Sequence, residues 1–584
     1  MKAQAVHLFD YGDVTIEKGQ FKAIFERDYQ YYLSIKVEDM LYELRQHLGL
    51  DTQGGKTIAD EKGSWFGLGG NVLGQWLQAY SRLYAATASK AAKDKADQLA
   101  RGLMEVGEKS PILVDGTFMY FFEKYLRGFT DHYLFCNNDA SLEFASTFLD
   151  HIMASDIYIH ANKALGDNGP SSEIEWYTIP ESILHFAEIY EKNGRYPEKV
   201  EKYREFAEKF AYRRYWDIFV KHDSIFRHTP EAGQNTLYFH AYSHLNTFNS
   251  AAAFYRLQND KSLLKSIKEF YRWMRLNQEI ASGGYGCHLE WFMPRELMVS
   301  ALREYHDSTE TQCNSYAVYR LSNFLMETLG DAQYGHWPEK LFYNATLSSI
   351  PLENGHVMYY SDFCVKGGEK FLHQNTWTCC TGTRPLLLPE LKRMIFYYDE
   401  ESLFVNLFTP ASVTYQGLTL TQSTQFPESS IVSFYFSGTP TSLRLKIRKP
   451  EWMKDLPSFE QSGHFLPATL DQKGWIDLGI ISGSSDPINM TITPSLNTTS
   501  IETAGDPDNG VWALMAGPVM LAMANPDDAP GIPYPTDLKT DFHPGSKPME
   551  FIYRDWDNHP FKPFYVYPKG EHYRVYFNKK SGGR

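Results

Sequence analysis

Apolar residues recur at intervals of three and four positions through most of the first 400 residues, which is the spacing of amphipathic helices. Residues 90–106 and 198–215 show it most clearly, because good helix formers fill the positions between the apolar ones. Similar segments, separated by loops rich in Gly, Pro, Asn and Asp, occur at 28–48, 72–86, 140–154, 177–192, 246–257, 261–276, 314–329, 334–346 and 386–396. So many helices of similar length predict a toroid of paired helices.

Beyond about residue 400 the pattern changes to short alternating or β-branched runs, such as SSIVSFYFSG and SLRLKIRKP, punctuated by Pro, Gly and Ser. This texture is typical of a β-sandwich. Residues 525–549 are rich in Pro and Asp, which indicates a linker or a long surface loop before the last strand-like patches. We therefore predict a multidomain α and β protein, with a helical domain at 1–400, a β-sandwich domain at 401–525, and a linker with a second small β unit at 526–584.

Composition and charge narrow the possible partners. The 584-residue chain has 43% hydrophobic and 22% charged residues, which is ordinary for globular proteins, whereas its 15% of aromatic residues is high. Aromatic side chains stack well on flat ligands such as sugars. A net charge of -14 supplies no positive field, so we expect neither nucleic acid nor an anionic membrane surface as a partner.

Hydropathy along the chain bears on its location. No apolar stretch approaches the roughly 18 residues that span a bilayer, and the N-terminus lacks a basic segment followed by an apolar run. We therefore expect a soluble chain. A periplasmic and a cytoplasmic location both stay open, because a signal peptide is absent from a mature protein.

The adjacent thiols of Cys379 and Cys380 are the strongest local feature, and we expect them in a short loop just before a helix. With a third thiol from elsewhere they can hold a soft or borderline cation such as zinc, provided that all are ionised. Cys313 is the third candidate, and the carboxylate of Glu310 lies close to it in sequence at the start of a helix. Free cysteines are also common small core residues, so the spacing leaves a purely structural role open.

Carboxylates are the second chemical ingredient, because acid/base reactions need a group that gives and takes a proton. Glu290 lies in a glycine-rich loop that bears aromatic residues, which is where a barrel of helices would present a reactive side chain. Its competitors are Glu296, Glu310 and Glu339, each of which could equally be a solvated or salt-bridged side chain. His244 and Trp176 are either a sugar-contacting histidine and a stacking ring, or packing residues.

Several segments, in this order along the chain, resemble glycoside hydrolase family 127, the group typified by β-L-arabinofuranosidases. They are residues 31–50, 74–85, 244–247, 313–316, 330–331, 339–344, 379–383, 403–407 and 516–519. The resemblance implies an (α/α)6 barrel catalytic domain followed by β-sandwich modules. It also implies a retaining reaction in which a zinc-bound cysteine thiolate replaces the usual carboxylate nucleophile.

The resemblance assigns a role to each candidate residue. By position, Cys379 is the nucleophile, Cys380 and Cys313 are its fellow zinc ligands, and Glu290 is the acid/base. The pocket for the sugar would be lined by His244, Glu339, Trp176 and either Tyr359 or Tyr360.

One position departs from the family pattern. The family usually places a zinc-binding glutamate two residues before the cysteine that matches Cys313, and here that position is Thr311. A one-residue bulge would let Glu310 serve as the ligand. Otherwise three thiolates suffice, or zinc is absent and Glu290 and Glu310 act as a carboxylate pair.

The expected activity is that of an exo-acting glycoside hydrolase that releases a terminal sugar from fragments of a plant or algal polysaccharide. The family default is β-L-arabinofuranose, and the altered metal motif keeps 3,6-anhydro-galactose or aceric acid as alternatives. Two further classes stay open, because fold alone does not fix the reaction: a sugar isomerase or lyase, and a non-catalytic glycan-binding protein. The β modules could support a homodimer.

Overall fold

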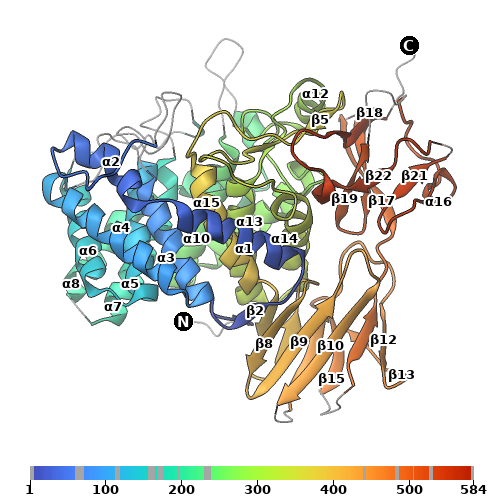
Figure 1. Ribbon diagram of the computed structural model, residues 1–584, viewed down its shortest axis with the longest axis horizontal. Coiled ribbons are helices and arrows are strands. Elements are labelled where there is room, and N and C mark those ends of the chain that lie inside the picture. Colours follow the sequence, from blue (N-terminus) through green and yellow to red (C-terminus); the bar gives the residue numbers. More distant parts are fainter. Residues whose placement is uncertain are drawn as a thin grey trace.

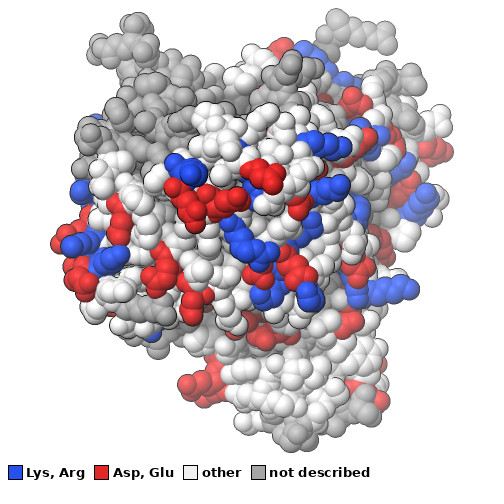
Figure 2. Space-filling view, turned by 60° about the vertical axis from the view of Figure 1, so that its left-hand side comes forward, with Lys and Arg blue, Asp and Glu red and all other residues white. Residues whose placement is uncertain are grey.

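The computed structural model places a helical domain beside two β-sheet regions (Figure 1). It describes the whole chain except residues 1–4, 59–71, 112–118, 156–164, 168–174, 195, 229–238, 439–441, 481–485, 504, 525–530, 555 and 580–584. None of the described helices is long and apolar enough to cross a membrane. On the face that Figure 2 shows, acidic and basic side chains are interspersed.

The helices of the first domain occur in one continuous series along the chain. They are α1 (Gln20–Ser34), α2 (Val37–His47), α3 (Leu73–Thr87), α4 (Lys90–Lys109), α5 (Met119–Cys136), α6 (Asp139–Ala154), α7 (Pro180–Lys192), α8 (Pro197–Glu208), α9 (Arg213–Val220), α10 (Ala241–Gln258), α11 (Lys261–Asn277), α12 (Arg295–Glu304), α13 (Gln312–Leu329), α14 (His336–Leu341) and α15 (Cys379–Arg393).

Six of the described helices form a closed inner ring. Helices α3, α5, α7, α10, α13 and α15 contact one another in that order, and α15 contacts α3 again. An outer helix packs on each of them, namely α4, α6, α8, α11, α14 and α1. The predicted (α/α)6 barrel is therefore confirmed.

Burial distinguishes the two layers. On the outer helix α11 the buried apolar side chains are Leu263, Ile267, Phe270 and Met274, spaced by three and four as on one face of an amphipathic helix. On the inner helices α10 and α15 nearly every side chain is buried, including polar ones. The barrel interior thus buries polar groups, which need hydrogen-bond partners there.

Several helix boundaries differ from the sequence-based expectation. The segment predicted as one helix at 198–215 is divided into α8 and α9, with residues 209–212 between them. The segment predicted as one helix at 28–48 is divided into α1 and α2, because Ile35 has an extended backbone. The last helix begins at Cys379, seven residues before the predicted start, and continues through Pro385 and Pro389. Interior prolines normally interrupt a helix, but α15 is continuous across both of these. Cys379 and Cys380 consequently lie in the first turn of α15 and not in a loop before it.

Two sheets follow the barrel. The first, of six strands, has the order β1 (His7–Leu8), β6 (Phe396–Tyr398), β7 (Ser402–Val405), β11 (Arg444–Arg448), β15 (Trp475–Ile480) and β14 (Thr469–Leu470). The second, of seven strands, has the order β13 (His464–Phe465), β12 (Ser458–Gln461), β16 (Ile488–Thr491), β10 (Ile431–Gly438), β9 (Leu418–Thr424), β8 (Ala411–Tyr415) and β2 (Val14–Ile16). Strands β1 and β2 come from the N-terminal end of the chain, so this segment ties the two regions together.

A nine-stranded sheet contains most of the remaining strands. Its members are β17 (Leu496–Thr503), β18 (Asp506–Ala516), β19 (Val519–Ala524), β20 (Phe542–Pro544), β21 (Phe551–Tyr553), β22 (Phe561–Pro563), β23 (His572–Arg574), β24 (Tyr576–Asn578) and β5 (Gly368–Glu369). Strand β5 comes from the segment between α14 and α15 and pairs with β23. Part of the predicted linker, 525–530, lies outside the described residues, and after it residues Leu538–Asp541 form the short helix α16.

A buried ion pair joins the barrel to the first sheet. Arg448 of β11 lies 2.6 Å from Glu339 of α14, and their side chains are 0% and 2% exposed. Trp452 also donates a hydrogen bond to Glu339, at 3.1 Å. The Glu339 carboxylate therefore neutralises a guanidinium that has no access to water.

Replacing Glu339 should destabilise the protein strongly, because the charge of Arg448 would stay buried without its carboxylate. For Glu339→Ala we expect the free energy of unfolding to fall by about 3–5 kcal/mol, measured by urea unfolding followed through tryptophan fluorescence. The matched control is Glu353→Ala, which removes an exposed pair with Lys569 and should change the free energy of unfolding by about 1 kcal/mol or less. Equal effects of the two variants would contradict the structural role of the buried pair.

Candidate functional site

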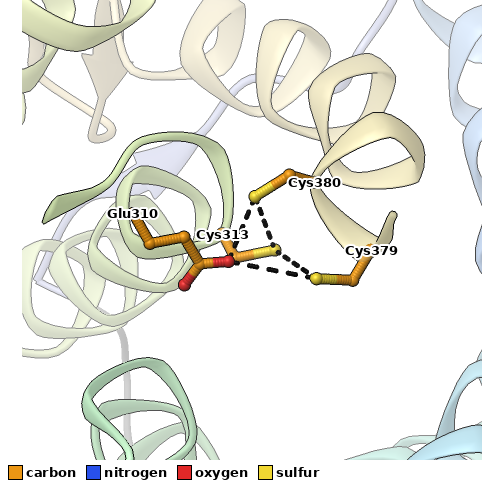
Figure 3. A group of neighbouring side chains, drawn as sticks. All are labelled: Glu310, Cys313, Cys379 and Cys380. Atoms are coloured by element: carbon orange, nitrogen blue, oxygen red, sulfur yellow. Dashed lines mark hydrogen bonds between the residues drawn. The ribbon is translucent and has the colours of Figure 1, made fainter. Parts of the chain in front are cut away.

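Three cysteines and one glutamate converge inside the barrel. Cys379 and Cys380 occupy the first turn of α15, Cys313 occupies the first turn of α13, and Glu310 belongs to the short strand β3 (Thr309–Glu310) just before α13 (Figure 3). All four are buried, and one ligand atom from each lies within 4.8 Å of the others. The sequence-predicted ligand set is thus gathered in one place.

The distances between the donor atoms are short. The sulfur of Cys313 lies 3.7 Å from that of Cys379 and 3.5 Å from that of Cys380. Oε1 of Glu310 lies 3.1 Å from the Cys380 sulfur and 3.9 Å from the Cys379 sulfur. Glu310 therefore reaches the thiols although it stands three residues before Cys313.

Local backbone structure explains why Glu310 and not Thr311 faces the thiols. Glu310 pairs with Tyr360 in a short antiparallel ladder between β3 and β4 (Tyr360–Ser361). The next residue, Thr311, makes a hydroxyl contact with Ser361 at 3.1 Å, and the helix begins directly after it. The β3–β4 ladder keeps a regular register up to Glu310, and Thr311 occupies the position before α13, so Glu310 reaches the thiols from the end of the strand.

Hydrogen bonds and burial shift the pKa values of the four groups in opposite directions. Hydrogen bonds from Cys313 and Cys380 lower the pKa of the Cys379 thiol well below its usual value. Burial raises the pKa of Cys313, Cys380 and Glu310 well above their usual values. The N-terminal end of a helix also favours negative charge in its first turn. Cys379 is therefore the thiol best able to act as a thiolate.

The four residues fit a divalent metal ion. Three thiols and one carboxylate are a donor set that zinc accepts, and ligands at its tetrahedral corners lie roughly 3.8 Å apart when the zinc–sulfur bonds are about 2.3 Å. Four of the six donor distances are 3.1 to 3.9 Å, near that spacing, and all six lie within 4.8 Å. The second carboxylate oxygen of Glu310 is buried and has no hydrogen-bond partner among the described residues. A cation would neutralise this cluster, which burial alone keeps partly protonated.

Glu290 lies on an unusual turn beside the cluster. His288, Leu289 and Glu290 have φ angles of 60°, 52° and 63°, so three successive residues that are not glycine adopt a left-handed backbone. Such a conformation costs roughly 1–2 kcal/mol per residue. The Glu290 carboxylate accepts a hydrogen bond from the Tyr360 hydroxyl at 2.6 Å and contacts Nε2 of His240 at 2.9 Å. The turn thus presents the carboxylate to two proton-bearing groups.

His240 was not among the sequence-predicted residues, although it lies at the start of α10, four residues before His244. Burial alone would lower the pKa of His240, but the hydrogen bond to Glu290 and the charge of Glu175 raise it to about 10. Burial likewise raises the pKa of Glu290, and the His240 hydrogen bond outweighs this and lowers it. The pair is an imidazolium beside a carboxylate. The spacing of four residues between the two histidines was the signal that could have identified His240.

Two tyrosines connect the cluster with Glu290. The Tyr359 hydroxyl lies 3.8 Å from the sulfur of Cys379, and the Tyr359 ring packs against that of Tyr360 with centroids 4.8 Å apart. Its neighbour Tyr360 donates to Glu290. Both tyrosines were predicted from the sequence, and one of them contacts the thiol while its neighbour contacts the carboxylate.

The remaining predicted residues lie in two places. Nδ1 of His244 contacts the Tyr177 hydroxyl at 3.0 Å, and the ring packs against Tyr215, so burial lowers the pKa of His244 to about 3. Trp176 is buried on the same short helical turn as Tyr177. Glu339 is instead paired with Arg448 at the edge of the first sheet, so its predicted contact with a sugar stays a prediction.

Comparison with known proteins gives the chain a family. Residues 13–391 match the model of the GH127 catalytic domain of β-L-arabinofuranosidases, and residues 402–493 match the GH127 middle domain. A comparison with curated proteins finds no match.

Solved structures have the same fold. A GH127 β-arabinofuranosidase has a TM-score of 0.70 and 14% sequence identity over 99% of this chain and 98% of its own. A GH127 β-L-arabinofuranosidase from Geobacillus stearothermophilus T6 has a TM-score of 0.68 and 15% identity over 97% of this chain and 100% of its own. Because the catalytic-domain model covers residues 13–391, which is more than half of the chain, the chain belongs to glycoside hydrolase family 127 and is a glycosidase.

Proposed function

We propose that this glycosidase is a retaining, zinc-dependent β-L-arabinofuranosidase in which Cys379 is the nucleophile and Glu290 is the acid/base. The observation that carries the proposal is the neighbouring pair of tyrosines: the Tyr359 hydroxyl lies 3.8 Å from the Cys379 sulfur, and the Tyr360 hydroxyl donates to the Glu290 carboxylate at 2.6 Å. A reacting sugar needs a nucleophile on one side and a proton donor within reach of the departing oxygen. The two neighbouring tyrosines hold the thiol and the carboxylate in one site.

The first chemical step forms a bond between Cys379 and the sugar. The thiolate of Cys379 attacks the anomeric carbon, the bond to the departing oxygen breaks, and that oxygen takes a proton from Glu290. The pair holds one proton, on His240 at 2.9 Å from the Glu290 carboxylate, and Glu290 relays that proton to the departing oxygen, which leaves His240 neutral and Glu290 a carboxylate. The product of this step is a thioglycoside on Cys379.

The second step releases the sugar with retained configuration. Glu290, now a carboxylate, accepts a proton from a water molecule that attacks the anomeric carbon, and the carbon–sulfur bond breaks. A zinc ion held by Glu310, Cys313, Cys379 and Cys380 would keep the thiols ionised near neutral pH and would stabilise the departing thiolate. His244, Trp176 and the tyrosines Tyr359 and Tyr360 would line the sugar pocket.

The alternative without zinc is less well supported. It needs Glu290 and Glu310 as a carboxylate pair, with Glu310 ionised to activate water or to attack. Burial raises the pKa of Glu310 well above its usual value, and its Oε1 lies 3.1 Å from the Cys380 sulfur. This environment suits a metal ligand better than a free base, although 3,6-anhydro-galactose and aceric acid stay in the substrate panel below.

Removing the sulfur of Cys379 should abolish turnover while the protein stays folded, because no other ionised nucleophile would face the sugar. Cys379→Ala is expected to lose more than about 10⁴-fold in kcat. We would measure sugar release from oligosaccharides with terminal β-L-arabinofuranose, 3,6-anhydro-galactose or aceric acid. Cys136→Ala, which removes a buried thiol of α5 outside the cluster, should keep the parent activity. Undiminished cleavage by Cys379→Ala would refute the cysteine nucleophile.

The metal proposal has a readout that does not depend on activity. The purified protein is expected to contain about one zinc ion per chain, measured by elemental mass spectrometry after dialysis. Cys313→Ala and Glu310→Ala should each lose most of that zinc at a chelator concentration that leaves the parent loaded, because each removes one of four ligands. Glu296→Ala, an exposed carboxylate on α12, is the matched control and should keep it. Equal zinc content in all these variants would contradict this ligand set.

A further inference from the structure

The left-handed turn that carries Glu290 needs something to hold it. Three successive residues, His288, Leu289 and Glu290, have positive φ angles, and their Cβ atoms disfavour that conformation. Leu289 and Glu290 are not among the residues that adopt it most readily, which are Gly, Asn, Asp and His. The conformation therefore depends on contacts that the surrounding structure supplies.

Asp307 makes those contacts. Its carboxylate accepts hydrogen bonds from Nδ1 of His288, at 2.8 and 3.1 Å to the two oxygens, and from the backbone N–H of Leu289 at 3.0 Å. Its backbone carbonyl accepts the N–H of His288 at 3.2 Å. The ring of His288 also stacks on Tyr305, with centroids 3.6 Å apart and planes 5° from parallel. One short segment thus holds two of the three residues of the turn.

The third residue of the turn is Glu290, the proposed proton donor. The backbone carbonyl of Glu290 accepts the N–H of Ala241 at 2.7 Å, and its carboxylate lies between Tyr360 and His240. Asp307 makes no hydrogen bond with Glu290 among the described contacts, so it acts on that carboxylate through the backbone of the turn. Asp307 also precedes Glu310 by three residues, so the same segment carries a metal-ligand candidate.

We propose that Asp307 is a positioning residue, which holds the left-handed turn and thereby fixes the Glu290 carboxyl at the distance from Cys379 that protonation of the departing oxygen requires. The inference rests on the proposed role of Glu290 as acid/base. Displacing a reacting group by about 1 Å costs on the order of 100-fold in rate. The loss of rate should appear only with substrates whose departing group needs a proton.

The test compares two glycosides of the sugar that the substrate panel identifies. A methyl glycoside has a poor leaving group that needs the proton, whereas a 2,4-dinitrophenyl glycoside departs without it. For Asp307→Ala we expect kcat/KM for the methyl glycoside to fall by about 100-fold, and kcat/KM for the dinitrophenyl glycoside to stay near the parent value. Asp307→Asn keeps an acceptor oxygen for the Leu289 N–H, and its loss should fall between the parent and the alanine variant.

Two further variants separate the possible failures. Glu304→Ala removes an exposed carboxylate three residues away, paired only with Lys366 at 3.2 Å among the described contacts, and should match the parent on both glycosides. Glu290→Ala should lose kcat/KM for the methyl glycoside to the full extent and keep kcat/KM for the dinitrophenyl glycoside. If Glu290→Ala loses kcat/KM selectively for the methyl glycoside and neither Asp307 variant does, the positioning role is refuted. If Glu290→Ala loses both glycosides equally, the acid/base assignment itself is wrong.

Discussion

Four groups that ionise to negative charge are packed together in the interior of this barrel, and most of the site follows from that constraint. Thiols and a carboxylate within 4.8 Å of one another cannot all ionise when they are buried without a compensating positive charge. The fold supplies part of it by placing the cysteines in the first turns of α13 and α15, where the peptide dipoles favour an anion. A divalent cation would supply the rest.

The inner helices that carry the cysteines of this cluster are buried on nearly every side. Their order around the ring brings α13 and α15 side by side, so residues 66 positions apart in the chain meet at their sulfur atoms. The outer helices, which are amphipathic, cover this layer and keep water from it. Exclusion of water is what makes the charge on Cys379 sensitive to its two neighbouring thiols.

Glu290 belongs to a different part of the barrel from the cluster of Glu310 and the cysteines, but one segment serves both. Residues 307–310 hold the Glu290 turn at one end and contribute the carboxylate of the cluster at the other. The ladder between β3 and β4 then places Tyr359 and Tyr360 across both. A small shift of this segment would therefore move the carboxylates of Glu290 and Glu310 together.

The sequence by itself determined the fold class and the chemical inventory, because helical periodicity, β-branched alternation and the adjacent cysteines are local signals. It also left the position of Glu310 open, since the family spacing pointed to Thr311, and only the strand that precedes α13 decides which of the two faces the thiols. His240 and Asp307 could not be predicted as parts of the site, because their importance lies in contacts with residues 50 and 19 positions away. Glu339 matched a family motif, yet its partner is Arg448 of the first sheet, a pairing that no local pattern contains. Local sequence thus specifies which groups are available, and the closure of the barrel decides which of them meet.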